Sequence, residues 1–98
     1  MYQIHKTDRF VNWIDGLRDL KGRARILARV ARLASGHAGD VKPVGEGVSE
    51  MRIDVGPGYR VYFVKHGLVW IILLAGGDKS TQSADIKTAL QLARNLRD

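Results

Sequence analysis

The feature that most constrains this fold is a Gly56-Pro57-Gly58 turn that follows a segment of alternating apolar and polar residues. A period of two is typical of a β-strand with one face against a core. The alternating residues are Met51, Ile53 and Val55 on one face, and Glu50, Arg52 and Asp54 on the other. Residues 59–65 continue the pattern after the turn, so an antiparallel hairpin is predicted.

The loop length predicts the pairing within this hairpin. If Gly56, Pro57 and Gly58 form the loop, Ile53 faces Val61 and Asp54 faces Arg60. This register places apolar residues opposite apolar ones and polar residues opposite polar ones.

Three further strands are predicted around the hairpin. Residues 2–5 form a short first strand and residues 41–44 a short edge strand. Residues 68–75 are apolar without alternation, which is typical of a central strand covered on both faces.

Three helices complete the prediction. Thr7 or Asp8 can cap the first helix, and its apolar residues recur with helical spacing at Phe10, Trp13, Ile14 and Leu17. The second helix covers about residues 20–34 and ends near Gly36. The third covers about residues 81–96.

The order β-α-α-β-β-β-β-α predicts one α+β domain over residues 1–98. We expect a mostly antiparallel sheet with the two N-terminal helices packed on one face, and chemistry on the other. The aromatic side chains Phe10, Trp13 and Trp70 each belong to an apolar pattern, so we predict that they lie in the core.

Composition excludes several classes of site. The chain contains no cysteine, which excludes disulfide scaffolds, cysteine zinc sites and cysteine nucleophiles. Its 3 histidines are scattered, so we expect no metal, no cofactor, and metal-free acid–base chemistry. The longest apolar run, residues 68–75, is far shorter than the roughly 20 residues that span a bilayer, so a cytoplasmic protein without a membrane partner is expected.

The charge balance favours a polyanionic partner. Lys and Arg number 16 against 10 Asp and Glu, a net charge of +6. On the second predicted helix, four cations fall within an arc of about 80°: Lys21, Arg25, Arg29 and Arg32. This stripe either contacts RNA phosphates, as on a ribosome, or is a solvated helix face.

Two segments carry a family resemblance: GPGYRVYF at residues 56–63 and LLAGGDKSTQ at residues 73–82. With them the chain resembles the RelE/ParE toxin superfamily, and within it the HigB-like branch of phage-derived addiction module killer proteins. Residues 23–26, 39–42 and 44–52 agree with the same branch, so the resemblance covers nearly the whole chain.

The resemblance implies a bacterial, cytoplasmic toxin of a type II toxin–antitoxin system. RelE-like toxins are mRNA interferases, endoribonucleases that bind the ribosome and cleave mRNA there without a metal ion. ParE-like toxins share the fold and inhibit DNA gyrase, and an inactive module that only binds its antitoxin is a third possibility. The expected partners are the ribosome with its mRNA and a small helix-turn-helix antitoxin encoded adjacently.

The resemblance also suggests which cations contact RNA. Arg60 is similar to the family's phosphate-contacting arginine, and its guanidinium can hold two phosphate oxygens. Lys79 resembles a basic residue of the family at the start of the last helix, and Arg52 lies on the same predicted strand face as Arg60. The alternatives are a surface salt bridge from Arg60 to Asp54, and solvated side chains for Arg52 and Lys79.

The general acid or base is where this sequence departs from the family pattern. Relatives often carry Tyr or His near the start of the last helix, and this chain has Gln82-Ser83-Ala84-Asp85 there. Tyr62, Asp85 and Gln82 are substitutes by position, and His37 is a further candidate from the loop after the second helix.

Overall fold

A computed structural model describes residues 1–97 as one sheet with helices on both faces. The five-stranded sheet has the order β1-β5-β4-β3-β2. Its strands are β1 (Gln3–Lys6), β2 (Val41–Gly45), β3 (Val48–Ile53), β4 (Tyr59–His66) and β5 (Trp70–Asp78). β1 pairs with β5 in parallel and the other neighbours are antiparallel, which confirms the α+β class and the mostly antiparallel sheet.

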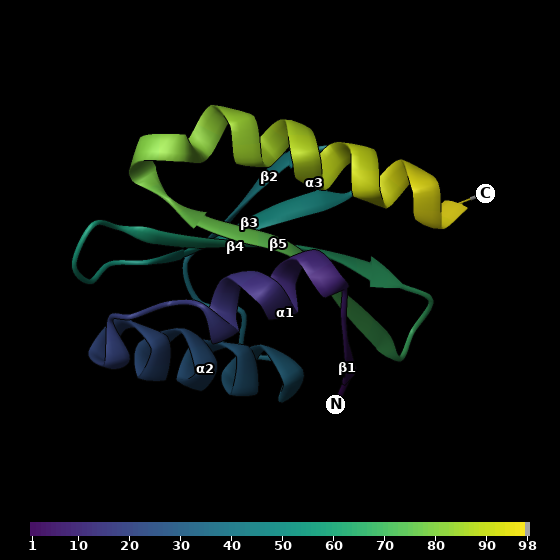
Figure 1. The fold of residues 1–98 in the computed structure, drawn as a ribbon. Helices are drawn as coiled ribbons and strands as arrows, with labels where there is room; N and C mark the ends of the chain where they lie inside the picture. Colours follow the sequence, from purple (N-terminus) through teal and green to yellow (C-terminus); the bar gives the residue numbers. More distant parts are fainter. Residues whose placement is uncertain (98) are drawn as a thin grey trace.

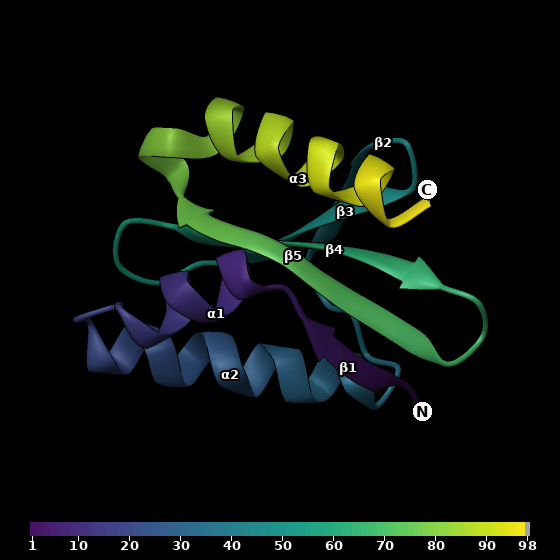
Figure 2. The same ribbon diagram turned by 45° about the vertical axis from the view of Figure 1, so that its right-hand side comes forward.

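The helices form the outer two of three layers (Figure 1). α1 (Asp8–Asp15) and α2 (Leu20–Ala34) lie on one face, and α3 (Gln82–Arg97) crosses the other after a short 3-10 helix, η1 (Lys79–Thr81). Figure 2 shows α1 and α2 side by side beneath the sheet. No helix among residues 1–97 combines the length and apolarity that crossing a bilayer requires.

Side-chain caps explain where α1 and α2 begin. The Thr7 hydroxyl accepts a hydrogen bond from the amide of Phe10 at 3.1 Å and donates one to the Leu74 carbonyl at 2.7 Å. Asp19 caps α2 by accepting from the amide of Gly22 at 3.0 Å. Of the two predicted caps of α1, Thr7 is the one observed, and the predicted range of α2 is confirmed.

The core has one part on each side of the sheet. On the side of α1 and α2, the buried residues include Phe10, Ile26, Met51, Val61 and Leu73. On the side of α3, they include Val48, Tyr62, Leu74, Ala75 and Ala89. The residues of β5 therefore pack on both faces, as predicted for the central strand.

Trp70 is not in the core, so that prediction is wrong. It remains 41% exposed, whereas Phe10 is fully buried and Trp13 packs partly buried against the core. Trp70 is the first residue of β5, next to the β4–β5 turn, and contacts His5 edge-on with ring centroids 6.4 Å apart.

The predicted hairpin register is wrong by two residues. Ile53 pairs with Tyr59 instead of Val61, and Arg52 pairs with Arg60. The loop is longer than expected because Val55 leaves the ladder and bonds locally, its amide donating to the Ile53 carbonyl at 2.9 Å. A shift of two keeps each side chain on its predicted face, so the two faces are correct although the partners are not.

β5 begins at Trp70 rather than at residue 68, and it continues past the predicted end at Ala75 to Asp78. Glycine permits this continuation because helices pack closely on both faces. A Cβ at Gly76 would overlap the Trp13 ring of α1, and a Cβ at Gly77 would overlap the Asp85 carboxylate of α3.

Candidate functional site

A hollow of about 300 Å³ opens at the end of the sheet where the β3–β4 hairpin meets the end of β5. Its lining residues are Asp40, Arg52, Asp54, Gly58, Arg60 and Lys79. The structure therefore brings Lys79, which follows β5, to Arg52 and Arg60 of the β3–β4 hairpin. Three cations and two carboxylates share this small volume.

Arg52 and Arg60 are direct cross-strand partners, and the buried Glu50 lies behind both. Nε of Arg52 donates to Oε1 of Glu50 at 3.1 Å, and Nε of Arg60 lies 3.7 Å from Oε2 as an ion pair. Their side chains are 35% and 11% exposed. Each Nε faces Glu50, and Arg60 Nη1 donates to the Gly58 carbonyl at 3.4 Å. Arg60 Nη2 and the two terminal nitrogens of Arg52 remain for a ligand in the hollow that both residues line.

Glu50 is a fully buried carboxylate with several donors. Tyr62 Oη donates to Oε2 at 3.1 Å, and Gln82 Nε2 donates to the same oxygen at 2.8 Å. Burial raises the pKa of Glu50, but hydrogen bonds from Gln82, Arg52 and Tyr62 and the charge of Arg60 outweigh it, and the pKa is lowered overall. Glu50 is therefore a stable anion in the folded protein.

Tyr62 and Gln82 support Glu50 rather than line the hollow. Tyr62 is fully buried beneath α3, and its burial together with the negative charge of Glu50 strongly raises the pKa of its hydroxyl. It is poorly placed to exchange a proton with a ligand.

Asp85 also lies outside the hollow's lining. Its Oδ2 accepts from the Thr81 hydroxyl at 2.6 Å, in the first turn of α3 as predicted. This bond and the close contact with Gly77 give Asp85 a structural role at the junction of β5 with α3. His37 is exposed and is likewise not part of the lining.

Lys79 reaches the rim of the hollow because the chain turns sharply after β5. The Asp78 carboxylate accepts from the amide of Ser80 at 2.8 Å and from its hydroxyl. Both bonds lower the pKa of Asp78, the hydroxyl bond foremost. Asp78 therefore caps η1, and the exposed Lys79 begins it.

The sequence did not predict that Glu50 would accept hydrogen bonds from several side chains. It also did not predict that Asp40 and Asp54 would line the hollow. Asp40 comes from the loop before β2, and its carbonyl accepts from the amide of Arg52 at 2.9 Å. The only signal in the sequence is that Glu50, Arg52 and Asp54 share a strand face. Nothing in the pattern says that the first would be buried and the last exposed.

The predicted stripe on α2 divides in two. Lys21, Arg25 and Arg32 are exposed. Arg29 instead turns toward the protein: its Nη1 donates to the Arg52 carbonyl at 2.7 Å and its Nη2 to the Ala38 carbonyl at 3.1 Å. Arg29 thus fastens α2 to β3, and only the other three cations form an open face.

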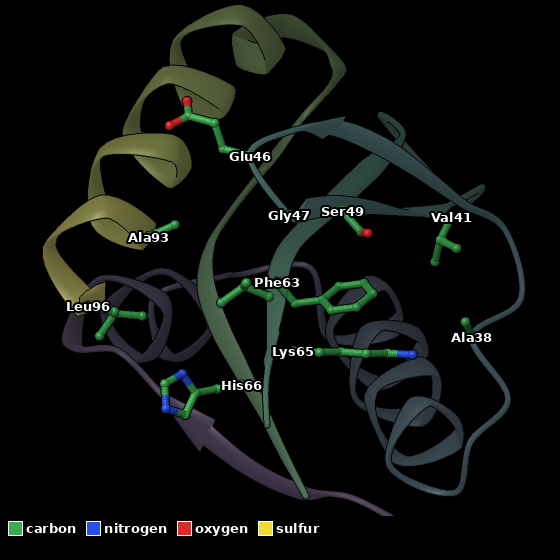
Figure 3. Close-up of a pocket in the computed structure, with 11 residues that line it drawn as sticks. Ala38, Val41, Glu46, Gly47, Ser49, Phe63, Lys65, His66, Ala93 and Leu96 are labelled. Atoms are coloured by element: carbon green, nitrogen blue, oxygen red, sulfur yellow. The ribbon is translucent and has the colours of Figure 1, made fainter. Parts of the chain in front are cut away.

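A larger hollow of about 410 Å³ lies near the C-terminal end of α3, and Figure 3 shows its lining. Phe63, Val41 and Leu96 line it together with Lys65 and His66. None of the predicted site residues contributes to it. We place the candidate site at the smaller hollow, because its convergent cations can bind an anion, which the mostly apolar larger hollow does not offer.

The residues described contain no group of three or more His, Asp or Glu side chains arranged to hold a metal ion. The ligand class that the smaller hollow suits is therefore judged from its cations. Two planar guanidiniums and an ammonium are the donors that bind phosphate oxygens.

Comparison with known proteins identifies a relative of this chain. No protein-family model matches the chain. The chain is 50% identical over 94 residues to an uncharacterized protein of Haemophilus influenzae, an alignment that covers 96% of this chain and 95% of the relative. The two proteins belong to one family.

Proposed function

We propose that this protein is the toxin of a type II toxin–antitoxin system and a ribosome-dependent mRNA endoribonuclease. The observation that carries the proposal is the convergence of Arg52, Arg60 and Lys79 on one hollow. The resemblance to HigB-like members of the RelE/ParE superfamily supplies the reaction class. A cognate antitoxin is then the expected partner in the cell.

The chemistry follows from what RNA cleavage requires. The 2′-oxygen attacks the adjacent phosphorus, the bond from phosphorus to the 5′-oxygen breaks, and a 2′,3′-cyclic phosphate forms. Arg52 and Arg60 would hold the non-bridging oxygens and stabilise their charge as it grows in the transition state. Lys79 would stand beside the leaving 5′-oxygen and supply its proton.

The proton of the 2′-hydroxyl needs an acceptor. Asp40 and Asp54 are the two carboxylates that line the hollow, and both are exposed. Either would take this proton more directly than Tyr62 or Asp85, which the structure holds in other contacts. We therefore assign the base to the pair Asp40 and Asp54.

The test is cleavage by a variant that carries both Arg60→Ala and Lys79→Ala. Messenger RNA 5′ ends are mapped after brief expression in a bacterium and in a purified translation system. We expect wild type to cut within translated frames and the variant to lose at least about 100-fold in rate. The control, Lys87→Ala with Arg94→Ala, removes the same charge from exposed positions of α3. Absence of translation-coupled cleavage by wild type, or an unchanged rate in the Arg60 and Lys79 variant, contradicts the proposal.

One observation favours a second function, inhibition of DNA gyrase. The hollow's lining contains no tyrosine or histidine among the residues described, and the positional substitute Tyr62 is buried. A gyrase supercoiling assay separates the two functions, because only a gyrase poison traps cleaved DNA. If neither activity nor growth arrest accompanies expression, an inactive antitoxin-binding module is the remaining reading.

A further inference from the structure

Arg52 and Arg60 occupy positions that ought to repel each other. They face each other directly across β3 and β4, and like charges in such pairs destabilise a sheet. Both side chains are also partly withdrawn from water, which strengthens the repulsion. Something in the fold must hold these two guanidiniums side by side.

The carboxylate of Glu50 holds the two guanidiniums together. It precedes Arg52 by two residues on the same strand face, and its two oxygens divide the arginines between them: Oε1 takes Nε of Arg52 and Oε2 faces Nε of Arg60. One buried charge thereby compensates two cations: Arg52 Nε by a hydrogen bond, and Arg60 Nε by an ion pair at 3.7 Å without a hydrogen bond.

Glu50 is itself held in place by two residues that do not line the hollow. Gln82 and Tyr62 both donate to Oε2 of Glu50. Gln82 is the first residue of α3, and Tyr62 is the cross-strand partner of Glu50 on β4. These bonds fix the carboxylate behind the arginines and keep it out of the lining. A bound phosphate would therefore meet the guanidiniums and not the carboxylate.

We infer that Glu50 is the positioning residue of this site, a buried carboxylate that orients Arg52 and Arg60 as a preformed pair for two oxygens of one phosphate. The predicted effect on the rate of mRNA cleavage rests on the proposed function, whereas the predicted orientation of Arg52 and Arg60 does not. Direct action as a general base is disfavoured because Glu50 is fully buried and its carboxylate accepts hydrogen bonds from Arg52, Tyr62 and Gln82 inside the protein.

The decisive variant is Glu50→Gln, which keeps the shape of the side chain and removes its charge. The first readout is the NMR signal of the arginine Nε–H groups, which shifts when a hydrogen-bond acceptor is lost, as at Arg52, or when a neighbouring charge is removed, as at Arg60. We expect two such signals, assigned with Arg52→Lys and Arg60→Lys, to move in Glu50→Gln. The matched control is Glu46→Gln, which removes an exposed carboxylate that pairs with Arg94 at 2.6 Å, and it should leave both signals unchanged.

The second readout is single-turnover cleavage of mRNA on programmed ribosomes. Misplacing the arginines is expected to lower the cleavage rate by about ten- to a hundredfold while the affinity for the ribosome stays the same. The pH profile should keep its shape, because a positioning group donates and accepts no proton in the reaction. A lost acidic limb would instead identify Glu50 as the base and overturn the inference, as would a wild-type rate in Glu50→Gln.

Tyr62→Phe is a milder second variant should Glu50→Gln fold poorly. It removes one donor to Glu50 and no charge, so the Arg52 and Arg60 signals should shift in the same direction by less. Unchanged Arg52 and Arg60 signals in this variant would contradict the positioning role of Glu50.

A further measurement separates this inference from the proposed function. Titration of wild type with inorganic phosphate should perturb both arginine signals, and Glu50→Gln should weaken that response several-fold. If wild type cleaves no mRNA but these shifts occur, the proposed function fails and the positioning role stands. If wild type cleaves mRNA and Glu50→Gln changes neither signals nor rate, the positioning role fails alone.

Discussion

Tyr59 connects α2 to the sheet through one hydroxyl group. Its Oη donates to Oδ2 of Asp19 at 2.7 Å, and its ring lies edge-on to Trp13 with centroids 6.3 Å apart. Gly22 leaves room for this contact, since a Cβ there would lie 2.5 Å from Cε2 of Tyr59. The cap of a helix and the first residue of a strand are thus one structural unit.

This unit predicts an acid-sensitive contribution to stability. The Gly22 amide and the Tyr59 hydroxyl lower the pKa of Asp19 below its ordinary 3.8. The folded state then binds this proton more weakly than the unfolded chain, so the stabilisation is present above pH 3.8 and is lost as pH falls through the folded-state pKa. Asp19→Asn, which still caps the helix, should show a shallower acid loss.

Urea unfolding between about pH 2 and pH 7 measures this effect. Tyr59→Phe removes one of the two main donors to Asp19 and should give an intermediate slope. Parallel curves for wild type and Asp19→Asn throughout the acid range would contradict the assignment.

At the scale of elements, a glycine with a left-handed backbone lies on each side of β4, in the two turns that flank this strand. Gly58 has φ +79° before β4, and Gly67 has φ +64° after it. Gly58 lines the candidate site, where its carbonyl accepts from Arg60 Nη1 at 3.4 Å. A Cβ at Gly67 would meet open space.

These glycines form a matched pair for a mutational test. Gly58→Ala and Gly67→Ala should each cost about 1 kcal/mol in unfolding free energy, because alanine disfavours positive φ. Only Gly58→Ala should also weaken phosphate binding and cleavage, since it moves the backbone that holds Arg60. Equal activity in the two variants would show that the loop does not position the arginine.

At the scale of the whole molecule, the cations of this chain of net charge +6 gather on separate surfaces. In the candidate hollow, Arg52, Arg60 and Lys79 meet Asp40 and Asp54, with Glu50 behind them. On α2, Lys21, Arg25 and Arg32 form an open cationic face. Long-range attraction to a polyanion therefore belongs to α2, and the hollow supplies short-range recognition.

Salt dependence tests this division. Replacing Lys21, Arg25 and Arg32 by alanine should make the plot of log K for RNA against log salt concentration shallower by about 2. Each phosphate contact with single-stranded RNA contributes roughly 0.7 to this slope, and three contacts are removed. The control replaces Arg9, Lys42 and Lys87, which are exposed on other elements. Fluorescence anisotropy with a single-stranded RNA measures both, and an equal loss of slope in the two variants would remove the special role of α2.

The elements themselves were predictable because periodicity is a local property. Helical spacing located α2 at its observed bounds, and alternation correctly placed Met51, Ile53 and Val61 on one face of the β3–β4 hairpin and Tyr62 on the other. Register was not predictable, because a slip of two residues leaves each face unchanged. The pairing of Arg52 with Arg60 depended on a loop that local bonding lengthened.

The sequence by itself determined the α+β class, the order of the elements and the cationic face of α2, because each follows from residues that are neighbours in the chain. Tertiary structure alone decided that Glu50 is buried beside two arginines and that Arg29 donates hydrogen bonds to backbone carbonyls. The physical reason is that a side chain's charge is written in the sequence, whereas its exposure and its partners depend on what packing brings from distant segments.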